Sequence, residues 1–290
     1  MERELWPLLY HVIRRVANDF SQKNVRYQPW ILVAVTLWAA LHDRPMSWAC
    51  DERNWSTTSL RPCRIPSAST LSRRAHGVAV GLFRRAVEEA IREGQEPALV
   101  AFIDGKPLSI PAISSDPDAG FGRGAGEKSK GYKLHAVISS RAVPEAWEVT
   151  PINVAETTVA QALIGRLGHG GYLLGDGNYD ASAVFDAAGE KGYALRTPHP
   201  ELNAGQGHHY QSPHRLRSIQ TRGTEFSKAL RKARGEIERR FGTLSSFDCG
   251  LKPLPAWVRR LHRVRTWLWD KILINAARIL KKQGLTSILQ

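Results

Sequence analysis

The stretch Ala98-Leu99-Val100-Ala101-Phe102-Ile103-Asp104 is an apolar run that ends in a carboxylate. A second run of the same kind, Gly171-Tyr172-Leu173-Leu174-Gly175-Asp176, follows later in the chain. Short apolar runs that end at polar or turn-forming residues favour buried β-strands. Because open α/β sheets bind their ligands outside the carboxyl ends of the strands, Asp104 and Asp176 are predicted to face one crevice.

The sequence around these two strands predicts a mixed α/β domain. Further strands are expected over 131–139, 146–152 and 193–197, and helices over 156–167, 179–189 and 228–241. The segment 198–224 is rich in His, Gly, Pro and Arg and has little hydrophobic period, so it predicts a loop. The resulting order, β-β-β-α-β-α-β-α, is by analogy that of an RNase H-like fold.

The sequence before residue 96 has a different, all-helical pattern. Apolar residues at helical spacing predict helices near the N-terminus, over 29–41 and over 78–93, the last ended by Gly94. The segment 66–76 resembles the second helix of a helix-turn-helix, although a plain capped helix with a solvated basic face explains it equally well. Two domains are expected: a helical DNA-binding domain over 1–95, and a catalytic domain over 96–290 that includes the basic loop and a final helix over 255–282.

The composition points to a folded, intracellular protein that binds a polyanion. The 290 residues are 42% hydrophobic and carry a formal net charge of +14, and the excess of Lys and Arg is concentrated after residue 200. Three scattered cysteines form no pair motif, which fits a reducing compartment. No signal peptide is visible, and the longest apolar run, 30–41, is too short to span a bilayer. We therefore expect a cytoplasmic protein without a membrane partner.

A third carboxylate for a metal site is expected in the basic helix over 228–241. Both Glu236 and Glu238 lie there, about 200° apart around a helix, so only one can face the site, and periodicity does not choose between them. Asp180 follows Asp176 by one helical turn and could instead cap or orient. Three carboxylates form the oxygen-rich site that hard divalent cations prefer. Two such ions can activate water or a 3′-hydroxyl for attack on a phosphodiester.

Three motifs resemble those of a known family: IDGKP (103–107), GDGNYD (175–180) and RGEIERRFG (234–242). They resemble the acidic blocks of DDE transposases of the insertion-sequence 4/5 type. In the third block an Arg precedes the acid by four residues, and this spacing selects Glu238 over Glu236. The resemblance implies that Asp104, Asp176 and Glu238 are the catalytic residues and bind Mg²⁺, with Mn²⁺ as a substitute.

The same resemblance implies contacts with DNA from basic residues near these motifs. The family's Tyr and Lys positions in the third block hold Arg231 and Ser245 here, so other cations of that helix would replace the lysine. The Gly-rich stretch 122–133 suits a phosphate track, and an ordinary solvated hairpin is the alternative. The expected DNA-binding residues are therefore Lys128, Lys130, Lys133, Arg231, Arg234 and Arg239, together with Arg73 and Arg74 from the helix-turn-helix-like segment 66–76.

The function that follows is that of a bacterial, nucleoid-associated DNA transposase. It is expected to bind the terminal inverted repeats of an insertion sequence as a homodimer, cleave there with divalent metal, and join the freed 3′-hydroxyl to target DNA. The alternatives are a structure-selective nuclease on the same fold, and a DNA-binding regulator that has lost the chemistry.

Overall fold

The protein is described by a computed structural model that covers residues 2–124, 126–168, 170–198, 210–245, 251 and 254–290. The chain forms two compact units. The helical unit comprises Met1–Glu96 and Thr243–Gln290, and the sheet unit comprises Pro97–Gly242. The first division coincides with the expected boundary near residue 95. The C-terminal segment, which we expected with the catalytic domain, groups instead with the N-terminal helices.

The helical unit is built around two helices that are almost entirely buried. Its helices are α1 (Glu2–Ala17), α2 (Pro29–Leu41), α3 (Ala68–Arg74), α4 (Val78–Glu93) and α9 (Leu261–Lys282), with short 3₁₀ turns η1 (Trp48–Cys50), η2 (Glu52–Trp55) and η4 (Thr286–Leu289). Nearly every side chain of α2 is buried, and α9 packs against both α2 and α1. This burial explains why the last helix belongs here: its apolar surface completes the core of the N-terminal helices. It begins at Leu261 rather than near 255, because Arg260 has a left-handed φ of 73°.

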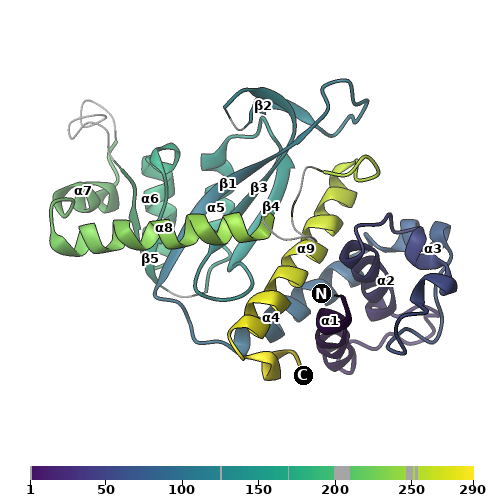
Figure 1. Ribbon diagram of the computed structural model, residues 1–290. Coiled ribbons are helices and arrows are strands. Elements are labelled where there is room, and N and C mark those ends of the chain that lie inside the picture. The colour runs from purple at the N-terminus through teal and green to yellow at the C-terminus, as the bar shows by residue number, and fades with distance from the viewer. Residues whose placement is uncertain (1, 125, 169, 199–209, 246–250, 252–253) are drawn as a thin grey trace. The chain divides into compact units, whose positions relative to one another are not determined.

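The sheet unit contains a six-stranded mixed sheet (Figure 1). The strands are β1 (Val100–Ile110), β2 (Gly120–Arg123), β3 (Lys128–Ile138), β4 (Ala146–Pro151), β5 (Gly171–Leu174) and β6 (Tyr193–Arg196). On one side of β1 lies antiparallel β3, whose first part pairs with β2 and whose second part pairs with β4. On the other side, β5 and β6 run parallel to β1. This mixed sheet confirms the expected RNase H-like fold class.

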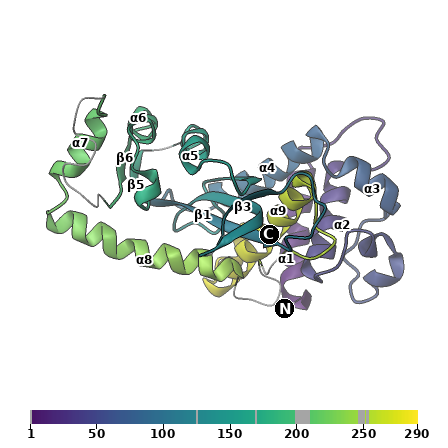
Figure 2. The same cartoon turned by 90° about the horizontal axis from the view of Figure 1, so that it is seen from above.

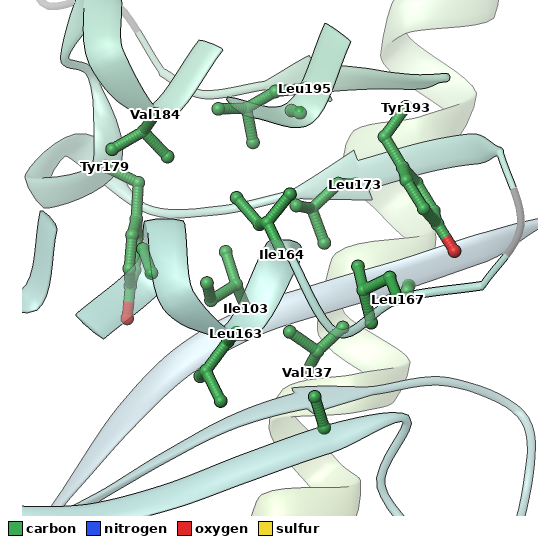
Figure 3. Close-up of a cluster of buried hydrophobic side chains, with 14 of the residues drawn as sticks. Ile103, Val137, Leu163, Ile164, Leu167, Leu173, Tyr179, Val184, Tyr193 and Leu195 are labelled. Carbon is green, nitrogen blue, oxygen red and sulfur yellow. The ribbon is translucent and has the colours of Figure 1, made fainter. Parts of the chain in front are cut away.

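Helices cover both faces of this sheet (Figure 2). One face carries α5 (Glu156–Ile164) and α6 (Ser182–Glu190), and the other carries α8 (Glu225–Ser245). The first face holds a hydrophobic cluster that includes Ile103, Leu163 and Leu173 (Figure 3). On the second face the ring of Tyr172 on β5 lies 5.0 Å from that of Phe226 on α8. Since side chains alternate along a strand, even-numbered residues of β1 and β5 face α8 and odd-numbered ones face α5.

The first strand is longer than its apolar run. We expected it to end at Asp104, but β1 continues to Ile110 because residues 102–110 pair without interruption with β3. Its parallel pairing with β5 covers only Val100–Phe102. Asp104 is therefore inside a strand, two residues beyond the end of the parallel ladder.

The expected loop over 198–224 contains a helix, α7 (Pro213–Gln220). Ser212 caps its N-terminus by accepting a hydrogen bond from the Arg215 backbone N–H, and Pro213 occupies its first turn. The buried Arg215 guanidinium donates to both carboxylate oxygens of Asp180, at 2.8 and 3.0 Å. The ion pair between Arg215 and Asp180, which are far apart in sequence, thus stabilises α7, a helix that the pattern of hydrophobic residues did not predict. Residues 199–209 of this segment lie outside the described part of the chain.

In the described part of the chain, no helix is both long enough and apolar enough to cross a membrane.

The Asp180–Arg215 pair predicts a local stability effect. Asp180→Asn leaves a buried guanidinium without its counter-ion, which costs roughly 3 kcal/mol. Amide hydrogen exchange of α7, followed by mass spectrometry, should therefore accelerate in this variant. Glu190→Gln, at an exposed carboxylate ending α6, should leave α7 protected. Unchanged exchange in Asp180→Asn would show that other contacts hold α7.

Candidate active site

The pairing of two parallel strands brings Asp104 and Asp176 together. Phe102 on β1 is the register partner of Leu174 on β5. Asp104 and Asp176 each lie two residues further along, so they occupy matching positions beyond the ladder. Both are even-numbered, as are the residues of β1 and β5 that face α8. Both side chains are half-buried. The strand pairing therefore brings the two aspartates to neighbouring positions, and their role as site residues stays a prediction.

Burial and neighbouring carboxylates make ionisation of Asp104 unfavourable. Burial raises the pKa of Asp104 above its ordinary value, and the carboxylates of Asp176 and Glu156 raise it further. The Gly105 N–H, which donates to Asp104 Oδ1 at 2.8 Å, and the positive charge of Arg234 oppose this shift. Two neighbouring carboxylates in a half-buried site favour binding of a cation, since a cation would relieve their repulsion.

The Asp176 side chain is oriented by the turn that follows it. Asp176 caps the 3₁₀ turn η3 (Gly177–Tyr179), with Oδ1 accepting the backbone N–H of Asn178 at 2.9 Å. The Asn178 side chain donates Nδ2–H to Asp176 Oδ2 at 3.2 Å. Both carboxylate oxygens are thus held by one residue, and each has lone pairs left for a cation.

A buried phenol completes the surroundings of the two aspartates. The Tyr179 side chain is 1% exposed, and its hydroxyl has no hydrogen-bond partner among the described residues. Burial, together with the carboxylates of Glu156, Asp104 and Asp176, raises its pKa far above the ordinary value. Tyr179 therefore stays protonated and serves as packing beneath the site.

The donor set fits a divalent cation in part. Two aspartates with free lone pairs suit Mg²⁺ or Mn²⁺, which take few protein oxygens and retain water. Among the described residues, no group of three His, Cys, Asp or Glu side chains could hold a metal ion. Glu238 belongs to α8, but its side chain, like that of Glu236, lies outside the described part. The third ligand therefore remains a prediction.

One predicted DNA-binding residue, Arg234, lies near the two aspartates. Its charge lowers the pKa of Asp104, so the guanidinium lies near that carboxylate. Arg234 also lines a small cavity with Arg196 and Arg222, beside Gly175, the residue before Asp176. A cavity lined by three arginines beside the residue that precedes Asp176 suits a phosphate group.

The other predicted DNA-binding residues are more dispersed. Lys128 is exposed in the β2–β3 hairpin, and the Lys130 ammonium donates to the Ser114 carbonyl at 2.6 Å. Lys133 pairs in register with Pro107, so it faces α5, away from the face of Asp104. Its ammonium lies 2.6 Å from Glu156 Oε1.

On the helices, the predicted cations are mostly accessible. Arg73, at the end of α3, is exposed and donates to the Ser69 carbonyl, whereas Arg74 is half-buried. Arg239 is exposed on α8. The Arg231 side chain lies outside the described residues. All these DNA contacts remain predictions.

Sequence reasoning missed three residues beside the aspartates. Lys106 lies two residues after Asp104 on the same face of β1, and burial lowers its pKa while Asp104 raises it. Asn178 donates a hydrogen bond to Asp176 and another to Glu156. Glu156 is close enough to Asp104 for its charge to raise the pKa of that aspartate. Asn178 follows Asp176 by two residues, which is the spacing of an Asx turn and could have identified it. Glu156 carried no such local signal.

The mixed sheet, with two aspartates beyond its parallel ladder and an arginine on the covering helix, has the arrangement of an RNase H-like core. The family described as "Transposase DDE domain" matches residues 95–273. The chain therefore belongs to the DDE transposases. The insertion-sequence 4/5 subtype is compatible with this match.

The chain is also similar to a solved structure titled "Cryo-EM structure of piggyBac transposase synaptic complex with hairpin DNA". The sequences are 10% identical, the TM-score is 0.32, and the similarity covers 68% of this chain and 48% of the other. The region of similarity therefore spans about half the length of that transposase. A search of curated proteins gives no match.

The repulsion at Asp104 predicts opposite effects of one substitution with and without metal. Its raised pKa means that ionisation disfavours the folded state, so stability from this group is lost as pH rises through the ordinary carboxyl range. At pH 7 without metal, Asp104→Asn should therefore raise the melting temperature.

Added Mn²⁺ or Mg²⁺ should stabilise the wild type and have little effect on Asp104→Asn. Thermal melts with and without divalent metal measure both effects. Glu127→Gln, at an exposed turn carboxylate, should behave as wild type. Equal metal stabilisation of Asp104→Asn would rule out this carboxylate as a ligand.

Proposed function

We propose that this chain is an active DNA transposase that cuts the ends of a mobile element and joins them to target DNA. The observation that carries the proposal is the juxtaposition of Asp104 and Asp176 beyond the β1–β5 ladder within the transposase DDE domain. Arg234 and its basic cavity support a phosphodiester substrate. The net charge of +14 supports a polyanionic partner.

In this proposal the side chains around the site have separate roles in metal binding, phosphate binding and orientation. Asp104, Asp176 and Glu238 hold divalent ions, which we propose to be Mg²⁺ with Mn²⁺ as a substitute. When bound, such ions supply Lewis-acid activation of the attacking oxygen and stabilisation of the leaving oxygen. Glu238 is the proposed third ligand because it lies one turn beyond Arg234 on α8. Arg234 offsets the phosphate charge, and Asn178 orients Asp176 by its hydrogen bonds.

The helical unit and the basic residues around the site are proposed to hold the DNA. In this proposal α3 presents Arg73 and Arg74 to the terminal repeat, and Lys128, Lys130, Arg231 and Arg239 contact phosphates. Lys133, also expected from the sequence to bind DNA, is only 12% exposed and paired with Glu156, so it is given no phosphate contact here. Cutting two ends together calls for a homodimer. The site of action is the bacterial nucleoid, where both element and target lie.

The catalytic assignment is tested with Asp176→Asn on DNA that carries the element's inverted repeats, read from the sequence flanking its coding region. Cleavage should fall by at least a thousandfold, since the loss of one metal ligand removes most of the transition-state stabilisation. Binding to the repeat should stay within twofold of the wild type.

Precut ends then separate transposition from simple hydrolysis. Wild-type protein should join precut ends to a plasmid, and Asp176→Asn should not. Cleavage without joining would identify a nuclease, and repeat binding without either reaction in the wild type would identify a regulator. Full cleavage by Asp176→Asn would refute the site.

The role of α3 is tested by the salt dependence of binding. If Arg73 contacts a phosphate, Arg73→Ala should weaken binding to the repeat and lower the slope of log K against log salt by about 1. Arg53→Ala, at an exposed arginine paired with Asp51, serves as the matched control. Equal slopes for both variants would remove α3 from the interface.

A further inference from the structure

Behind Asp104, on the face of the sheet that carries α5, one carboxylate connects several parts of the site. Glu156 begins α5 and is only 17% exposed. Its Oε1 accepts a hydrogen bond from the Lys133 ammonium on β3 at 2.6 Å. Its Oε2 accepts from Asn178 Nδ2 at 3.2 Å. Because the same amide nitrogen donates to Asp176, Glu156 is linked to that aspartate through one side chain.

The backbone next to Asp104 makes room for this link. A Cβ placed on Gly105 would lie 3.1 Å from Glu156 Oε1 and 3.1 Å from Lys133 Cδ. Both contacts are tighter than usual, so the Lys133–Glu156 pair packs directly against the residue that follows Asp104. Gly105 also donates its N–H to Asp104 Oδ1. The ion pair therefore supports the strand segment and the turn that present the two aspartates.

The geometry does not make Glu156 the third metal ligand. Gly105, against which it packs, faces α5, whereas Asp104 faces α8. Both oxygens of Glu156 already accept hydrogen bonds. Glu156 also forms no three-carboxylate metal group with the two aspartates in the described part of the chain. Its charge nevertheless reaches Asp104, whose pKa it raises.

We propose that Glu156 is a positioning residue of the active site, which acts through Lys133 and Asn178 to fix the orientation of Asp176 and the strand at Asp104. This inference rests on the proposed transposase activity. Without the carboxylate, Asn178 keeps one acceptor instead of two, and Lys133 loses its counter-ion. Asp176 is then free to sample orientations that do not suit the chemistry. A displacement of about 1 Å at reacting groups can cost about a hundredfold in rate.

The test compares Glu156→Gln with Glu148→Gln in the full-length protein. Glu148, on β4, is also ion-paired, with Arg166 at 3.0 Å, and is partly exposed, so it controls for the loss of an ion pair in the same unit. Glu156→Gln should lower kcat for cleavage of inverted-repeat DNA by about ten- to a hundredfold, with KM for DNA and the half-saturating Mn²⁺ concentration within threefold of the wild type. Glu148→Gln should retain wild-type kinetics.

Coupling to the two partners distinguishes positioning from general destabilisation. If Glu156 acts through Lys133 and Asn178, adding Glu156→Gln to a Lys133→Gln, Asn178→Ala background should lower kcat less than threefold further. A readout independent of turnover is the labelling of Lys133 by an amine-reactive reagent, followed by mass spectrometry. Labelling should accelerate severalfold in Glu156→Gln, because in the wild type the Lys133 side chain is only 12% exposed and its ammonium is paired with Glu156.

Several outcomes would overturn the inference. One is that Glu156→Gln and Glu148→Gln have equal kinetics. Another is that Glu156→Gln needs a tenfold higher Mn²⁺ concentration for half-saturation, which would make Glu156 a metal ligand. A third is that its effect on kcat is fully additive with those of Lys133→Gln and Asn178→Ala. If Glu156→Gln fails to fold, Glu156→Asp, which keeps the charge but is one methylene shorter, should show the same fall in kcat with a native circular dichroism spectrum. Wild-type protein without cleavage would refute the proposed function itself, whereas an active wild type with an unaffected Glu156→Gln would refute only this inference.

Discussion

The parallel pairing of β1 with β5 is the constraint on which the site depends. Only three register pairs join the strands, Val100 to Tyr172 through Phe102 to Leu174. The ladder stops there while β1 continues along β3, so the two strands are no longer paired at the level of Asp104 and Asp176. The ladder is held by the cluster on the α5 face and by the ring contact of Tyr172 with Phe226 on the α8 face. Packing on both faces thus fixes the relative position of two aspartates far apart in sequence.

The charges around these aspartates show how the fold balances stability against function. Burial and like charge raise the pKa of Asp104, so the fold keeps a carboxylate where it is costly to ionise. Arg234 on α8 and the Gly105 N–H both reduce this cost. A divalent cation would reduce it further. A site arranged in this way would be less stable alone than with a bound cation, which is the expected cost of preorganised charges.

The chain order reflects a second constraint, the burial of α2. This helix is apolar on nearly all sides and needs partners around its whole circumference. Segments from both ends of the chain supply them, α1 and α4 from before the sheet unit and α9 from after it. Buried polar contacts accompany this packing: Asp270 on α9 accepts a hydrogen bond from Thr36 on α2, and the Lys271 ammonium donates to the Ala40 carbonyl and to Asp43. The sheet unit is therefore inserted between two parts of one helical core.

The sequence by itself determined five of the six strands, most helices and the positions of the two aspartates after their apolar runs, because these runs are local signals that packing did not override. It did not predict the short strand β2. Through the motif of the third acidic block it also predicted Arg234 as a DNA-binding residue and Glu238 as the third acid. Tertiary structure decided what depends on contacts between distant segments. It extended β1 beyond Asp104 through pairing with β3, formed α7 through the Arg215–Asp180 pair, and assigned α9 to the helical unit. It also brought Glu156 beside Lys133 and Asn178. A glutamate at a helix start has no local pattern that reports its neighbours, since the sheet register and the placement of α5 bring those neighbours to it.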